Sequence, residues 1–155
     1  MPMKKFKLWS WIVCGFLLLF LGATFVFHQF NLRNESKLLT PIGKQVTVNG
    51  HRMNISVKGE GPQTIVFLSG AGIASPILDF KNLSDPLSKK YKVVVVERAG
   101  YGFSQDSDCS RDVMEVLSET RQALAQAHVS GPYVIISHSM ASLESLAWQE
   151  KYPNE

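Results

Sequence analysis

The sequence predicts an α/β domain preceded by one transmembrane helix, and three observations carry this prediction. A run of 20 uncharged residues stands near the N-terminus. Further along, three short apolar runs are separated by stretches of helical length, and two alternating segments flank an Asn-Gly pair. Short runs without alternation are typical of parallel strands buried on both faces, and Asn-Gly is typical of a tight hairpin. We therefore expect an antiparallel hairpin followed by three parallel strands with crossover helices.

The N-terminal segment divides into a basic stretch, residues 1–7, and the predicted transmembrane helix, residues 8–28. As a helix, the uncharged run spans about 30 Å, the thickness of a bilayer's hydrocarbon core. A cleaved signal peptide is the alternative, but its apolar region is normally about 7–15 residues long and ends in an A-x-A-like site. Because Lys4, Lys5 and Lys7 precede the span, the positive-inside rule predicts a cytoplasmic N-terminus. We expect a single-pass protein of the cell membrane with an extracytoplasmic domain.

Charge is unevenly distributed along the chain. The whole sequence holds 16 basic and 13 acidic residues, of which five basic and one acidic lie in residues 1–40, so residues 41–155 carry 11 and 12. A domain that binds nucleic acid needs a basic surplus, so nucleic acid is excluded as a partner. The cysteines, Cys14 in the apolar run and Cys109 in a polar loop, predict no disulfide. No pattern predicts a metal site or a cofactor.

The elements expected after the apolar run follow from local patterns. Residues 29–41 are polar and form the predicted linker to a domain at 42–155. The hairpin is expected over 46–57, with Asn49-Gly50 at its turn. The predicted strands are Thr64–Leu68, Lys92–Val96 and Tyr133–Ile136. The predicted helices are 77–90, interrupted at Asp85-Pro86, 112–127, with its apolar residues on one stripe, and 141–152.

The segment Ser137-His138-Ser139-Met140-Ala141 joins the third apolar run to the last predicted helix. Small-x-Ser-x-small between a buried strand and a helix is typical of a nucleophile elbow, which exposes one serine hydroxyl for attack on an acyl carbon. The small residues at positions 137 and 141 allow strand and helix to approach at a strained turn. The alternative is an exposed serine at a helix N-cap. The placement favours Ser139 as a nucleophile.

Three motifs in this order and spacing resemble those of the α/β-hydrolase family. The elbow is similar to the family's G-x-S-x-G. The segment 68–72, Leu-Ser-Gly-Ala-Gly, resembles its H-G-x-G loop, with Ser69 in place of histidine. The segment 97–104, Glu-Arg-Ala-Gly-Tyr-Gly-Phe-Ser, is similar to its D-R-x-G-x-G-x-S, with Glu97 in place of aspartate. The resemblance covers about residues 42–155 and implies the first half of an α/β-hydrolase domain.

The resemblance implies roles for individual residues. Ser139 would be the nucleophile, and the backbone N–H groups of Met140 and Ala71 would form the oxyanion hole. Gly70 and Gly72 would let the backbone of their loop come close to a substrate. The side chains of residues 97 and 98 would brace loops without taking part in the chemistry.

The sequence departs from the family after Ser139, where an acid and then a histidine are expected. Only Glu144, Glu150 and Glu155 follow, and the histidines all come earlier: His28, His51, His128 and His138. None of the four is expected to act as the base, because adjacent side chains diverge at a tight turn and the others stand in unrelated elements. We therefore expect the N-terminal part of a larger enzyme or the product of a broken gene, inactive by itself, with an apolar strand at an unpaired sheet edge.

Three functions remain open at this point. The first is a membrane-anchored serine hydrolase of ester, amide or thioester bonds, acting on a small-molecule acyl substrate once completed. The second is a non-catalytic single-pass membrane protein whose half-domain binds a completing chain by strand addition. The third is a non-functional fragment. The sequence does not predict the substrate, because specificity in this family depends largely on a later cap region.

Overall fold

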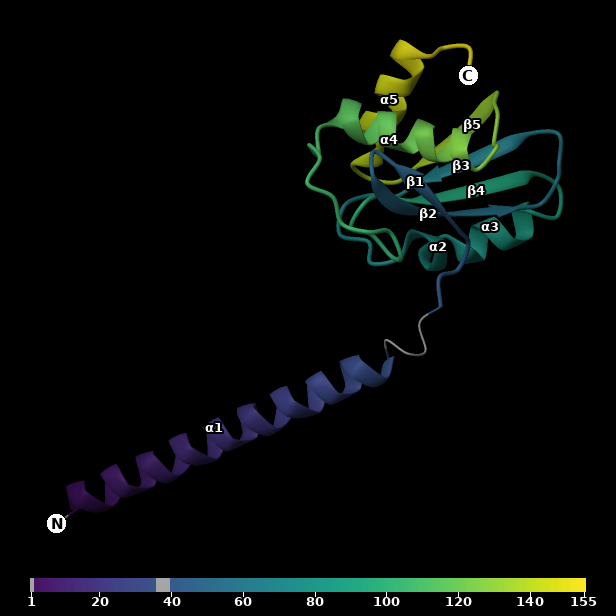
Figure 1. Cartoon of the computed structure of the whole chain (residues 1–155). Coiled ribbons are helices and arrows are strands. Elements are labelled where there is room, and N and C mark those ends of the chain that lie inside the picture. The colour runs from purple at the N-terminus through teal and green to yellow at the C-terminus, as the bar shows by residue number, and fades with distance from the viewer. Residues whose placement is uncertain (1, 36–39) are drawn as a thin grey trace. The chain divides into compact units, whose positions relative to one another are not determined.

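The computed structural model describes residues 2–35 and 40–155 (Figure 1). The chain separates into two compact units, Met1–Thr40 and Pro41–Glu155. The predicted linker, residues 29–41, divides between them: residues 29–35 are helical, and residues 36–39 lie outside the described residues.

The first unit is a single helix, α1 (Pro2–Glu35). The most apolar 18-residue window of its segment Leu8–Glu35 has a mean hydropathy of 2.2 and no buried residues, so α1 is long and apolar enough to cross a membrane. A signal sequence near an N-terminus meets the same criteria. The helix extends beyond the predicted 8–28 at both ends.

The second unit is built on a five-stranded mixed sheet in the order β1-β2-β4-β3-β5. The hairpin strands β1 and β2 are antiparallel, and β2 is antiparallel to β4. Strand β3 lies between β4 and β5 and is parallel to both. The predicted hairpin and three parallel strands are therefore confirmed. Their bounds are Lys44–Val48 (β1), His51–Lys58 (β2), Thr64–Leu68 (β3), Lys92–Glu97 (β4) and Tyr133–Ser137 (β5).

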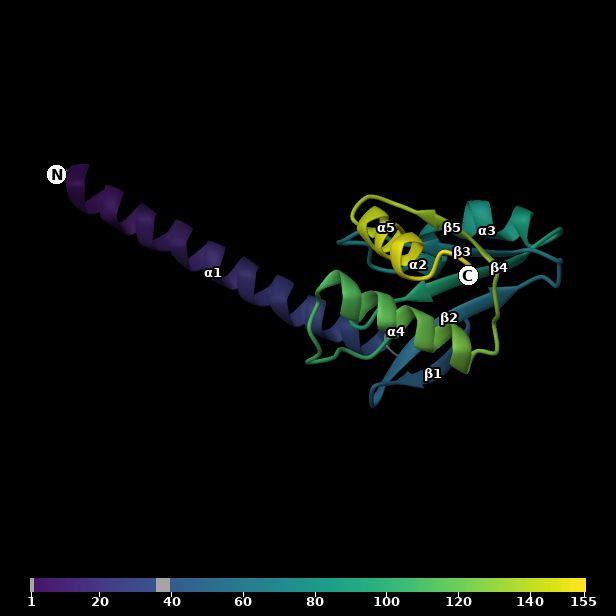
Figure 2. The same cartoon turned by 90° about the horizontal axis from the view of Figure 1, so that it is seen from above.

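Helices cover both faces of the sheet (Figures 1 and 2). On one face, α4 (Val113–Gln126) and α5 (Ala141–Lys151) close a core that contains Leu117, Leu124 and Trp148. On the other face, α2 (Pro76–Asp79) and α3 (Lys81–Leu87) cover a smaller core around Phe67. The predicted helix 77–90 is thus two short helices, and the break falls at Phe80 rather than at Asp85-Pro86. The parallel strands β3 and β4 contribute apolar residues to both cores, which explains their continuous apolar sequence.

Local sequence explains where several elements turn or begin. Asn49 and Gly50 have φ of 47° and 84°, the two left-handed residues that a type I′ hairpin turn requires. Asp112 caps α4 by accepting hydrogen bonds from the backbone N–H groups of Met114 and Glu115, both at 3.0 Å. After α4, His128 has φ of 60°, and the N–H of Val129 reaches back to the carbonyl of residue 124 at 2.9 Å.

Strand β5 stands at one edge of the sheet, where, among residues 40–155, it pairs with β3 alone. Its residues Tyr133 and Ile135 face the larger core. Val134 and Ile136 point to the opposite face and remain 38% and 37% exposed. The sequence predicted this apolar edge, and the structure places it directly before the elbow.

Candidate functional site

Ser139 lies in the turn between the end of β5 at Ser137 and the start of α5 at Ala141. Its φ is +56°, in the left-handed region that a non-glycine residue adopts at a cost. The residue is exposed, and among the described residues its hydroxyl has no hydrogen-bond partner. Ala141 is completely buried against the larger core, so a larger residue there would push the helix away from the strand. The turn therefore presents one serine in a strained, outward position.

Gly70, in the loop after β3, packs directly against this turn. A Cβ atom on Gly70 would lie 2.8 Å from Cβ of Ser139 and 3.0 Å from Nδ1 of His138. The N–H of His138 also donates to the carbonyl of Leu68 at 3.0 Å. The two loops that follow β3 and β5 are thus in contact, and the absence of a side chain at residue 70 permits the contact.

The remaining residues predicted for the site are exposed around the elbow and the loop after β3. Met140 follows Ser139 and is the residue before α5. Ala71 and Gly72 form an exposed turn after Gly70, and Gly72 has φ of 76°. The structure brings Gly70 against Ser139. The proposed oxyanion donors, the N–H groups of Met140 and Ala71, flank that contact along the chain, and their role stays a prediction.

Arg98, immediately after β4, connects the loop after β3 with α5 from the interior of the domain. Its guanidinium forms an ion pair with Glu144 on α5 and donates a hydrogen bond to the backbone carbonyl of Ser69. Both side chains of the pair are buried. One cation therefore ties the loop after β3 to the helix after the elbow, which is a bracing role of the kind that the sequence predicted for residue 98.

Burial raises the pKa of Glu144 to about 7, and this effect outweighs the opposing influence of Arg98. The carboxyl thus changes protonation near neutral pH while it remains inside the larger core. Glu144 reaches the loop after β3 only through Arg98, and the structure gives it no contact with Ser139. We assign it a positioning role.

Glu97, the last residue of β4, is fully buried and holds three segments together. Its carboxylate accepts hydrogen bonds from Nδ2 of Asn54 on β2 at 3.0 Å, Oγ of Ser75 before α2 at 2.9 Å and the N–H of Phe103 at 2.8 Å. A Cβ atom on Gly102 would lie only 2.1 Å from this carboxylate, and the backbone φ of Gly102 is 53°. These contacts give Glu97 and Gly102, the first and last residues of the Glu-Arg-x-Gly-x-Gly pattern, structural roles.

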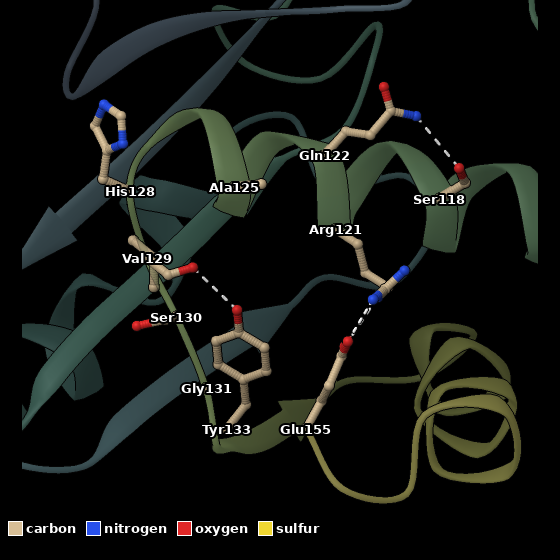
Figure 3. A pocket seen from close by; sticks show the side chains of 10 residues that line it. All are labelled: Ser118, Arg121, Gln122, Ala125, His128, Val129, Ser130, Gly131, Tyr133 and Glu155. Carbon is tan, nitrogen blue, oxygen red and sulfur yellow. Dashed lines mark hydrogen bonds and ion pairs between the residues drawn. The ribbon is translucent and has the colours of Figure 1, made fainter.

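A cavity of about 630 Å³ lies at the other end of β5 (Figure 3). It is lined by residues of α4, by the segment 128–131, by Tyr133 and by Glu155. Arg121 on α4 pairs with Glu155, and the hydroxyl of Tyr133 donates to the carbonyl of Val129 at 3.0 Å. Because Tyr133 begins β5 and Ser139 follows its end, this cavity does not belong to the candidate nucleophile.

Solved structures with the same arrangement identify the fold. An α/β-hydrolase fold protein from Burkholderia ambifaria matches 72% of this chain with a TM-score of 0.60 and 20% identity, and 39% of its own length is covered. The domain has part of an α/β-hydrolase fold. Est816, an N-acyl homoserine lactone degrading enzyme, shares this α/β-hydrolase fold over 72% of this chain and 42% of its own length, with a TM-score of 0.65 and 20% identity.

Two curated relatives are similar in sequence. The uncharacterised protein YbdG of Bacillus subtilis is 41% identical over 143 residues, which are 92% of this chain and 44% of YbdG. The 2-(acetamidomethylene)succinate hydrolase of Mesorhizobium japonicum is 25% identical over 73% of this chain and 39% of the enzyme. The chain therefore spans less than half the length of these relatives. No protein-family model matches the sequence.

Sequence reasoning missed the partner of Arg98. In the sequence, Glu144 is one of three glutamates that follow Ser139, and nothing nearby in the chain points to Arg98. The available signal was its place in α5, since residues 141, 144 and 148 fall on one helical stripe and all three are buried.

Proposed function

We propose that this protein is the nucleophile-bearing part of a membrane-anchored serine hydrolase that cleaves an ester, amide or thioester bond outside the cytoplasm. In this proposal, Ser139 attacks the acyl carbon, and the N–H groups of Met140 and Ala71 stabilise the oxyanion. The observation that carries it is the strained, exposed Ser139 in a strand-turn-helix, pressed against Gly70 of the neighbouring loop. The α/β-hydrolase fold and the relative from Mesorhizobium, a hydrolase, support the same chemistry.

Ser139 also needs a base, and the histidines of the Pro41–Glu155 unit offer none in a suitable position. His51 contacts Glu119 in the interior, and His128 ends α4. His138 is next to Ser139 in the chain, with Nδ1 close to Gly70. We therefore propose that the 155-residue chain is inactive alone, and that the acid and the histidine come from sequence corresponding to the later part of the relatives.

A fluorophosphonate probe, which reacts with an activated serine, tests this proposal. We expect no labelling of the 155-residue chain, and labelling of a fusion of this chain to the part of YbdG that lies beyond the matched region. The label in the fusion should disappear in Ser139→Ala and persist in Ser142→Ala, a neighbouring serine on α5. Labelling that survives Ser139→Ala, or a folded fusion that does not react, would overturn the assignment.

A second candidate function is that of an interaction module without catalysis, favoured by the exposed apolar edge at β5. Val134 and Ile136 form an uncovered apolar face on this strand. A partner chain that adds a strand would cover the unpaired backbone of the edge and bury these side chains. This function requires a stable complex that depends on the face formed by Val134 and Ile136.

A further inference from the structure

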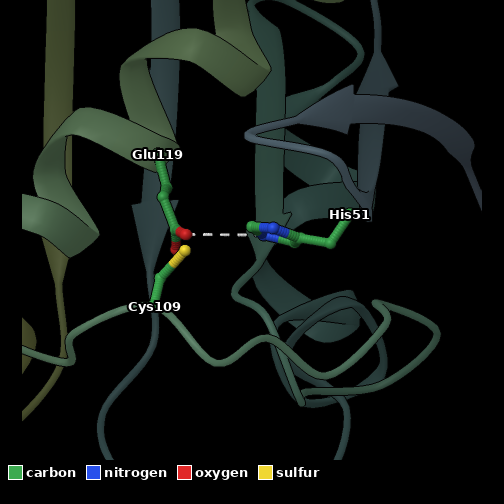
Figure 4. A group of neighbouring side chains, drawn as sticks. All are labelled: His51, Cys109 and Glu119. Atoms are coloured by element: carbon green, nitrogen blue, oxygen red, sulfur yellow. Dashed lines mark ion pairs between the residues drawn. The ribbon is translucent and has the colours of Figure 1, made fainter.

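A histidine, a cysteine and a glutamate meet beneath the hairpin turn, and none of them takes part in the candidate site at Ser139. His51 is the first residue of β2, Cys109 lies in the loop between β4 and α4, and Glu119 is on α4. Figure 4 shows the Glu119 carboxylate and the Cys109 sulfur side by side, facing the ring of His51. One ligand atom from each of these residues lies within 4.8 Å of the other two.

Within the described part of the chain, Nε2 of His51 and the carboxylate of Glu119 are buried without hydrogen-bond partners and lie opposite one another as an ion pair. His51 is 5% exposed and Glu119 is 1% exposed. Within residues 40–155, Nε2 of His51 and both carboxylate oxygens of Glu119 have no hydrogen-bond partner. A buried carboxylate that accepts no hydrogen bond costs several kcal/mol, so its side chain is expected to pair with a cation or another donor.

The spacing fits a tetrahedral metal ion better than a direct hydrogen bond. Nε2 of His51 and Oε1 of Glu119 are 3.4 Å apart, too far for a good hydrogen bond. Two ligand atoms that each lie about 2.1 Å from a tetrahedral zinc ion are about 3.4 Å from one another. The sulfur of Cys109 lies within 4.8 Å of a ligand atom of both residues.

The three segments that carry these residues are fastened to one another. Nδ2 of Asn49, in the hairpin turn, donates to Oε1 of Glu115 at 3.2 Å, one helical turn before Glu119 on α4. The N–H of Gln105 donates to the carbonyl of Arg52 at 2.8 Å and joins the Cys109 loop to β2. The ligand atoms are therefore held together by backbone and side-chain contacts that do not include them, as a pre-organised site requires.

A surface cavity with acidic residues lies beside His51 and Cys109. The cavity, of about 420 Å³, is lined by His51 and Cys109, by the hairpin turn and by residues 105–108, which include Asp106 and Asp108. Asp106 pairs with Arg111 at 3.2 Å, and Asp108 is exposed. The carboxylates at this cavity favour the approach of a cation.

We propose that His51, Cys109 and Glu119 bind a zinc ion. Imidazole, thiolate and carboxylate together suit Zn²⁺, and three protein ligands leave one tetrahedral position for water. Binding would remove the proton of the Cys109 thiol and compensate the buried charge of Glu119. Separations of 58 and 10 residues between consecutive ligands conceal the site from any spacing rule, which is why the sequence predicted no metal.

Metal binding to the full chain in detergent tests the proposal without any assay of activity. The protein should be purified through a tag without histidine or cysteine, kept reduced, stripped with a chelator and titrated with Zn²⁺. We expect one zinc ion per chain and a rise in the melting temperature. Co²⁺ in its place should give the absorption of a thiolate-to-metal charge transfer, which reports the sulfur ligand directly in the unmodified protein.

Variants identify the ligands. Cys109→Ser, His51→Gln and Glu119→Gln should each weaken zinc binding by at least about tenfold, and Cys109→Ser should abolish the charge-transfer band. Cys14→Ser and His128→Gln are the matched controls and should bind zinc as the unmodified chain does. If the reduced chain binds no zinc, or binds it equally well after Cys109→Ser, the cluster is only a buried His51–Glu119 ion pair and the proposal is wrong.

Discussion

Glu144 is the residue through which pH should act on the stability of the domain. Its pKa is about 7 when folded, against 4.5 as its ordinary value. Between these values the unfolded chain loses the proton first, so the free energy of unfolding should fall as pH rises from about 4.5 to 7. At 1.36 kcal/mol per pKa unit, the fall amounts to about 3 kcal/mol at most.

Glu144→Gln should remove this part of the pH dependence, because glutamine keeps the contact with Arg98 and does not ionise. Urea denaturation of the full chain at pH 5 and pH 7.5 measures it, with Trp148 as the fluorescent probe and Trp9 and Trp11 changed to phenylalanine. Glu150→Gln, an exposed position on the same helix, should behave as the unmodified protein does. If Glu144→Gln loses as much stability between pH 5 and pH 7.5 as the unmodified protein does, another group is responsible for the pH dependence.

At the scale of the element, the edge strand β5 should make the chain self-associate. It presents unpaired backbone groups beside the exposed side chains of Val134 and Ile136, and such edges pair with other chains. Val134→Lys places a charge on that face and should lower the association constant at least several-fold, as measured by sedimentation velocity in detergent. Met114→Lys, which charges an exposed apolar site on α4, is the control. Unchanged association in Val134→Lys would mean that β5 is not the contact.

The elements also show what local sequence can and cannot predict. The hairpin, the three parallel strands and the helix capped by Asp112 follow patterns within a few residues, and all were predicted. The break at Phe80 was not predicted. Ile77 holds α2 by packing against the sheet, a contact that the local sequence does not show, whereas Pro86 indicated a break later in the chain. Contacts between residues far apart in the sequence could not be predicted either. The pairing of Arg98 with Glu144 and the meeting of His51 with Glu119 depend on the topology of the sheet, whereas Ser139 was visible because its motif is contiguous.

At the scale of the whole molecule, α1 should remain attached and hold the domain outside the cytoplasm. Its length and apolarity suit a membrane span, and the lysines at 4, 5 and 7 that precede its apolar run favour a cytoplasmic N-terminus. In a bacterial host, alkaline phosphatase fused after Glu155 should be active, and green fluorescent protein at the same position should be dark. The membrane-bound product should retain its N-terminal residues by mass. A soluble product that begins after the apolar run would instead identify a cleaved signal peptide.

The contacts of Arg98 with Ser69 and Glu144 separate two requirements of the proposed catalytic site, the binding of the oxyanion and the transfer of a proton. The loop after β3 and the helix α5 are held together by the side chain of Arg98, immediately after β4, and all of these segments belong to the Pro41–Glu155 unit. The geometry that would receive a negatively charged oxygen can thus be set before any proton acceptor is in place. In the proposed enzyme, the segments held by Arg98 would bind the negatively charged oxygen. Residues outside this part of the chain would transfer the proton.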